Sequence, residues 1–229
     1  MPRGVAILEP RQQLFAAFER VITADGPSRL TSRAVTREAG VATGLLYAHF
    51  TNFDDFLVGY AVDRAFQISG AVADLPERAG FGTVAENLYQ AVLTTPLGTL
   101  TAWTRLTAFR PELAANVDAV LGSGIGGLHG IERAIAGYLA AEQRLRRVPA
   151  RADTGALALA VVGVLHHVAL TGPTDSATDN RIQRAISALT DDFPAAAPPR
   201  GETPSLDERH AEQCAEHRCP QPHDRQRTT

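Results

Sequence analysis

Five side chains that could bind a metal lie close together near the C-terminus. Thiolate and imidazole groups suit zinc or copper, and a His and a Cys four residues apart share one face of a helix. Their spacing matches no standard zinc finger, and few apolar residues surround them. An accidental grouping is therefore favoured, with a metal-responsive role as a minority hypothesis for His210, Cys214, His217, Cys219 and His223.

Motifs of the common enzyme classes are missing from the sequence. There is no GxSxG, no P-loop, no HExxH and no GxGxxG after a strand. The Gly-rich stretch SGIGG at 123–127 is too short for a phosphate loop and lacks the preceding strand. We therefore expect no enzymatic activity, no catalytic metal and no cofactor.

Residues 31–50, TSRAVTREAGVATGLLYAHF, have the pattern of two short helices joined by a tight turn. Val35, Ala39, Val41 and Leu46 are spaced to face inward, and Gly40 suits the left-handed backbone of the turn. This geometry is typical of a helix-turn-helix, whose second helix enters the DNA major groove. On spacing alone the signal is moderate, because many short helix pairs in bundles look alike.

The sequence around this pair resembles the tetracycline-repressor (TetR) family of bacterial regulators. An amphipathic helix precedes LTSRAVTREAGVATGLLYAHF, and TNFDDFL then opens a fourth helix. The resemblance covers about residues 10–60, and the later helices agree with the family in number, length and order. It implies a DNA-binding head followed by a helical domain that binds ligand and forms a dimer.

The resemblance also implies a set of DNA-contacting residues. The start of the second helix of the pair would face base edges or approach the backbone, its aromatic end would contact phosphates or bases, and the preceding helix would reach phosphate. Leu46 and Phe50 are assigned to the core, whereas Tyr47 is favoured as a phosphate contact. The predicted set is Thr31, Ser32, Arg33, Ala42, Thr43, Gly44, Leu45, Tyr47, His49 and Thr51.

The sequence departs from the family pattern at three positions. Most relatives have Ser-Lys where this chain has Ala42-Thr43, and Lys where it has Phe53. Ala42 cannot cap the recognition helix, which costs about 1 kcal/mol unless Thr43 takes the role. The loss of two cations should flatten the salt dependence of DNA binding. A flexible N-terminal arm with Arg3 and Arg11 could add phosphate contacts.

Composition places the whole chain in the all-α class. The 22 basic residues are all Arg, the net charge is -3, and 45% of the 229 residues are apolar. This balance excludes a polybasic coat, although not a local nucleic-acid site. Ala is abundant and runs with strand periodicity are absent. Helices are expected at about 10–24, from just after 31 or 32 to 40, over a short segment that carries Leu45, Leu46 and Tyr47, from about 52–55 to 73, and at about 82–94, 97–109, 111–121, 126–147, 153–171 and 180–192.

Three parts of the chain are expected: a helix-turn-helix domain (1–52), a helical ligand-binding and dimerisation domain (53–194) and a disordered tail (195–229), the last from its Pro, Gly and charge. Helices at 82–171 could enclose a mostly apolar pocket. Core packing is favoured for the aromatic candidates and an interface role for one of the two adjacent histidines. The ligand candidates are Trp103, Arg105, Phe109, His129, Tyr138 and His166.

These observations predict a cytoplasmic homodimer that binds a palindromic DNA operator and is released by a small, mostly apolar effector. No secretory signal is visible, and 156–170 looks too short and polar for a membrane span. The fourth helix would act as a lever, so that replacing Tyr60 or Phe66 should change effector response more than operator affinity. The alternatives are a ligand-binding dimer with weak or lost DNA binding, and the metal-responsive protein.

Overall fold

The N-terminal helices begin and end where local chemistry requires. The computed structural model describes residues 9–171 and 176–193. Helix α1 (Pro10–Asp25) has Pro in its first turn, where the missing N–H costs nothing, and Gly26 with φ 80° ends it. A 3₁₀ turn, η1 (Pro27–Arg29), leads to α2 (Ser32–Glu38), which is capped by the Thr31 hydroxyl. Helix α3 (Thr43–His49) follows after the Gly40 turn.

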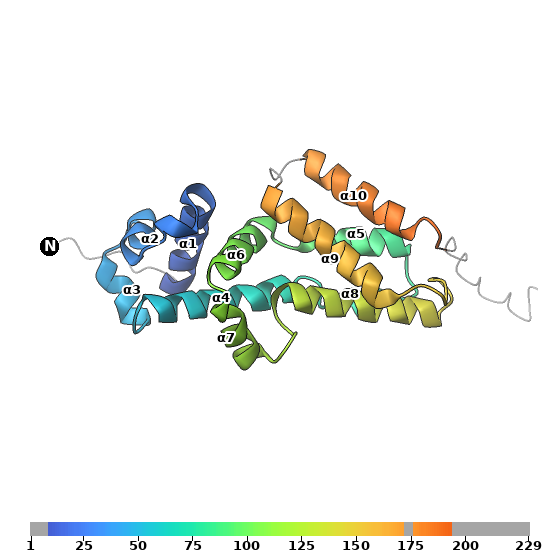
Figure 1. Ribbon diagram of the computed structural model, residues 1–229, viewed down its shortest axis with the longest axis horizontal. Coiled ribbons are helices and arrows are strands. Elements are labelled where there is room, and N and C mark those ends of the chain that lie inside the picture. Colours follow the sequence, from blue (N-terminus) through green and yellow to red (C-terminus); the bar gives the residue numbers. More distant parts are fainter. Residues whose placement is uncertain (1–8, 172–175, 194–229) are drawn as a thin grey trace, which may run out of the picture. The chain divides into compact units, whose positions relative to one another are not determined.

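Helix α4 (Phe53–Gly70) belongs to both halves of the described chain. Its first turns complete the core of α1–α3, and its later turns contact α6, α7 and α8 (Figure 1). The buried residues run without a break from the first helices into the rest of the bundle. We call α1–α3 with η1 the head, and the helices after α4 the body.

The body is a bundle of antiparallel and crossing helices. In Figure 1, α9 and α10 lie side by side, and α9 also packs on α6 and α8. The 3₁₀ turn η2 (Leu75–Arg78) links α4 to the body. The body helices are α5 (Val84–Thr94), α6 (Leu97–Phe109), α7 (Glu112–Leu121), α8 (Gly127–Arg144), α9 (Thr154–Thr171) and α10 (Ser176–Thr190).

Helix α9 is the one described helix that could cross a membrane by length and composition, with 18 residues and mean hydropathy 1.7. The length and hydropathy of α9 therefore do not support the expectation that this segment is too short and too polar to span a membrane. The indication is weak, because a helix inside a soluble bundle passes the same test. Ala158, Val161 and Leu165 are buried on one face, whereas only a third of the helix is buried in the chain.

The all-α prediction is confirmed: the described residues hold helices and no strand. Most helices lie within a few residues of their predicted places. The largest difference is at α10, which begins at Ser176 rather than at residue 180, inside the segment whose Gly, Pro and Asp predicted a loop. The predicted tail at 195–229, with its His and Cys side chains, and Arg3 of the predicted arm lie outside the described residues.

Candidate nucleic-acid interface

Apolar contacts hold α2 and α3 against α1 and leave one face of α3 open. Val35 and Leu46 are fully buried, and Ala39 and Phe50 are buried as well, so their inward placement is confirmed. Val41 is half-buried against the same core. The head core consists mainly of aromatic rings from α1 and α4, with Phe50 perpendicular to Phe56 at 5.1 Å between ring centroids. Packing thus decides which face of α3 points to solvent.

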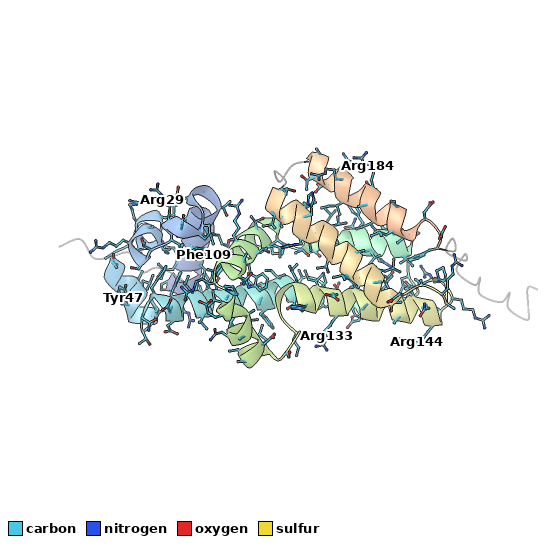
Figure 2. All side chains as sticks on the ribbon, in the orientation of Figure 1. Arg29, Tyr47, Phe109, Arg133, Arg144 and Arg184 are labelled. Atoms are coloured by element: carbon cyan, nitrogen blue, oxygen red, sulfur yellow. The ribbon has the colours of Figure 1, made fainter. Side chains whose placement is uncertain are left out.

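The open face of α3 carries several predicted contact residues. Gly44 and His49 are exposed, and a Cβ at Gly44 would meet open space. Tyr47 is 48% exposed (Figure 2), and its hydroxyl donates to Ser32 Oγ on α2 at 3.1 Å. Of the remaining predicted residues, Arg33, Ala42 and Thr51 are exposed and Leu45 is half-buried. The open face of α3 is therefore mostly uncharged.

A buried hydroxyl that sequence reasoning missed ties the two helices together. Thr36 is 1% exposed, donates to the Ser32 carbonyl at 2.9 Å, and lies 3.2 Å from the Thr43 hydroxyl. Ala42, at the N-cap of α3, supplies no side-chain bond. Thr43 does not move into the cap position; it pairs with Thr36 instead. The sequence signal that could have revealed Thr36 was a polar residue at a position whose spacing predicts an inward-facing side chain.

Replacing Thr36 by Val is expected to weaken DNA binding by about three- to tenfold, the cost of one hydrogen bond of about 0.5–1.5 kcal/mol. Val keeps the buried volume but leaves Thr43 without its partner, so the start of α3 loses its side-chain anchor. Fluorescence anisotropy with a selected operator measures the change. Thr36→Ser is the control and should retain affinity. Equal affinity for the Val and Ser variants would show that the hydroxyl pair does not position α3.

The start of α4 is fixed by reciprocal capping. The Asn52 side chain accepts from the Asp55 amide at 2.8 Å, and Asp55 Oδ2 accepts from the Thr51 amide at 2.8 Å. Two otherwise unpaired backbone donors are satisfied in this way. The link from α3 to α4 is therefore rigid.

Few cations of the head are available for phosphate. Arg20 pairs with Glu38 at 2.6 Å, and the Arg11 guanidinium lies 4.7 Å from the centre of the Phe50 ring. Arg33 and Arg37 are exposed on α2, and no ion pair engages them within the described residues. Arg29 in η1 is exposed as well, with no ion pair among the described residues, so the positive charge that remains is modest and only its part on α2 lies beside the recognition helix.

Comparison with known proteins decides what this head is. Residues 14–58 match the sequence profile of bacterial regulatory proteins of the tetR family. The head is similar to that of tetR-family regulators. The match covers α1 to the first turns of α4, the segment whose caps and buried residues are described above. A comparison with curated proteins finds no significant match.

Solved structures share the TetR-like fold over most of the chain. The fatty acid degradation regulator FadR from Bacillus halodurans has a TM-score of 0.60 at 17% identity, covering 81% of this chain and 96% of its own. Escherichia coli NemR, in its reduced form, has a TM-score of 0.60 at 15% identity, with 83% and 100% covered. Bacillus subtilis FadR, in complex with stearoyl-CoA, has a TM-score of 0.54 at 15% identity, with 82% and 99% covered.

Three of the six predicted ligand residues of this TetR-like body form hydrogen bonds with other parts of the chain. The Trp103 indole donates to the Ala61 carbonyl of α4 at 3.1 Å, and Arg105 donates to the Thr23 carbonyl of α1 at 2.8 Å. Tyr138 is fully buried, and its hydroxyl accepts from Asn87 at 2.9 Å. Burial raises the pKa of the Tyr138 phenol well above its usual value. Each of these three residues thus has a polar atom bonded to another part of the chain: inside the bundle for Trp103 and Tyr138, and at the surface for the contact of Arg105 with Thr23.

The other three ligand candidates lie at or near the surface. Phe109 is 52% exposed, His129 is exposed and His166 is half-buried. A groove of about 670 Å³ between α9 and α10 is lined by His167, not His166, together with Arg181 and Arg184. The helical spacing of Ala160, Val164 and His167 could have indicated this choice. Two further open hollows of about 430 and 390 Å³ are also lined by residues outside the predicted set.

Proposed function

We propose that the protein is a homodimeric transcriptional repressor that binds a palindromic operator and leaves it when a small, mostly apolar effector binds the body. The tetR-family head supports operator binding. The observation that carries the proposal is the division of α3 into a buried face, with Leu46 and Phe50, and an open face with Gly44 and Tyr47. We assign residues 1–52 to the head domain and 53–194 to the ligand-binding and dimerisation domain.

The surface of α9 supports the dimer. Leu159 is 58% exposed and Leu170 is 41% exposed, and Gly163 lies on the same face between them. An apolar helix face of this kind is normally covered by a partner. A second copy related by a two-fold axis would bury it together with the adjoining groove and α10. Two recognition helices would then meet successive major grooves about 34 Å apart.

Two observations support a regulated repressor. Helix α4 spans the head core and the body, so a change in the body can reach the head through one rigid element. FadR from Bacillus subtilis, a structural relative, binds stearoyl-CoA, which supports an effector with a large apolar part.

Within the described residues no three side chains of the metal-binding types gather at one place. The metal-responsive alternative would therefore depend on the tail.

Selection of binding sites from a random duplex library, at two salt concentrations, tests the proposal. We expect a palindrome with half-sites about one helical turn apart. If Arg33 and Arg37 of two heads contact phosphate, the logarithmic salt slope should be about -3.6, at about -0.9 for each of four contacts. Failure to enrich any site at low salt would contradict operator binding. The ligand-binding dimer without DNA binding would then be favoured.

A further inference from the structure

Two side chains of α6, and that of Arg110 at its C-cap, contact elements that build or position the head. Arg105 reaches the end of α1, Trp103 donates to α4 at Ala61, and Arg110 pairs with Asp54 in the first turn of α4 at 3.1 Å. The Arg110 pair lies at the surface and is shared with Glu112, so it contributes little to stability. Arg105 differs from both because it contacts α1 directly.

The end of α1 needs a partner that its own sequence does not provide. The last four carbonyls of a helix have no acceptor role inside it, and the last turn of α1 contains Asp25 and no basic residue. The amides of Arg29 and Leu30 bond to Gly26 and Pro27, beyond the helix. A cation is favourable at this negative end of the helix dipole.

Arg105 meets this need from 82 residues away in the sequence. Its Nη1 atom donates to the Thr23 carbonyl at 2.8 Å and to the Ile22 carbonyl at 3.4 Å. One guanidinium thus satisfies two carbonyls and brings a positive charge to the end of the helix. The Arg105 side chain is half-buried; its contact with the Ile22 carbonyl is partly buried, and its contact with the Thr23 carbonyl lies at the surface.

Helix α6 is also attached to α9. The Thr101 hydroxyl, one turn before Arg105 on the same face, lies 2.7 Å from the Ala169 carbonyl of α9 and 2.8 Å from the Leu97 carbonyl of its own helix, so its one proton is shared between these two acceptors. Helix α6 therefore connects the helix proposed for dimerisation with α1 of the head, without passing through α4. We propose that Arg105 is a positioning residue that sets the orientation of the head relative to α9, and so fixes the spacing of the two heads in the dimer.

This inference rests on the proposed function, since spacing matters only for a dimer on two half-sites. The test compares the full-length wild type with Arg105→Gln, Arg105→Lys and the control Arg133→Gln, an exposed Arg on α8. Affinity is measured for the selected operator and for versions with one base pair added or removed between the half-sites, which rotates them by about 34°. The readout is the ratio of the affinity for the selected operator to the affinity for each altered version. A general loss of stability does not change this ratio.

Wild type and Arg133→Gln should lose about tenfold in affinity when the spacing changes, within the usual range of coupling between sites. Arg105→Gln should lose about threefold or less, because its heads can adjust. Arg105→Lys should lie nearer the wild type, since its ammonium still places a cation at the end of α1. An equal spacing penalty in Arg105→Gln and wild type would overturn the proposal.

Hydrogen–deuterium exchange separates this inference from the operator. In Arg105→Gln, the amides of the last turn of α1 should exchange about threefold faster, because the released carbonyls allow that turn to fray. Arg133→Gln should show no change there. If no operator is selected, the proposed function fails, and faster exchange still supports the hold of Arg105 on α1. Unchanged exchange would overturn the inference whatever the operator result.

Discussion

Replacing Leu159 by Arg is expected to convert the proposed dimer into a folded monomer and to lower operator affinity by about a hundredfold or more. Leu159 is 58% exposed in the single chain, so the charge costs little in the monomer. Across a two-fold axis, each Arg would be driven into an apolar interface without a partner. A dimer holds two half-sites together and gains about 10²–10⁴ in avidity, which a monomer loses.

Light scattering coupled to gel filtration measures the first effect, as a change from twice the chain mass to 24.4 kDa. Operator titration measures the second. Val120→Arg is the matched control, because Val120 is 64% exposed on α7, away from α9. It should leave mass and affinity unchanged. A Leu159→Arg protein that remains a dimer with full affinity would place the subunit interface on another face.

Replacing Tyr60 by Ala should unfold the head, with a loss of about 3–5 kcal/mol in stability. Tyr60 is fully buried, and its ring centroid lies 4.1 Å from that of Phe18 and 5.5 Å from that of Phe15. Its hydroxyl donates to Glu19 at 3.4 Å. Burial and the Glu19 carboxylate raise the pKa of this phenol well above its usual value, so it stays neutral in the core.

Denaturant unfolding followed by circular dichroism measures this loss. Tyr60→Phe keeps the ring and removes one long hydrogen bond, so it should cost about 1 kcal/mol or less. Arg64 would still pair with Glu19 at 2.7 Å and hold α4 to α1. If Tyr60→Ala retained near wild-type stability, the aromatic packing between α1 and α4 would not be what holds the head together.

The burial of Tyr60 changes the expectation that Tyr60 and Phe66 have the same effect on the lever helix, α4. Phe66 is 66% exposed on the same helix, so its replacement by Ala should change stability by about 0.5 kcal/mol or less. Phe66 therefore stays a suitable position for testing the response to effector. Any loss of operator binding in Tyr60→Ala would report unfolding of the head.

The helices of the head could be predicted from the sequence alone. Local signals suffice there: Pro10 and Thr31 at helix starts, Gly40 at the turn, the Asn52 cap, and apolar spacing that separates buried Leu46 from exposed Tyr47. Each of these effects acts within a few residues along the chain. The order and approximate lengths of the body helices followed from the same periodicity, interrupted by Gly and Pro.

The roles of the body residues could not be predicted in this way, because they depend on contacts between distant segments. Trp103 and Arg105 were predicted as ligand candidates in a pocket. Their hydrogen-bond partners, the carbonyls of Ala61 and Thr23, lie 42 and 82 residues away in the sequence. The choice between His166 and His167 depends on where α10 packs beside α9. Helical spacing says which residues share a face. It does not say what that face meets, because the partner is set by packing between distant segments.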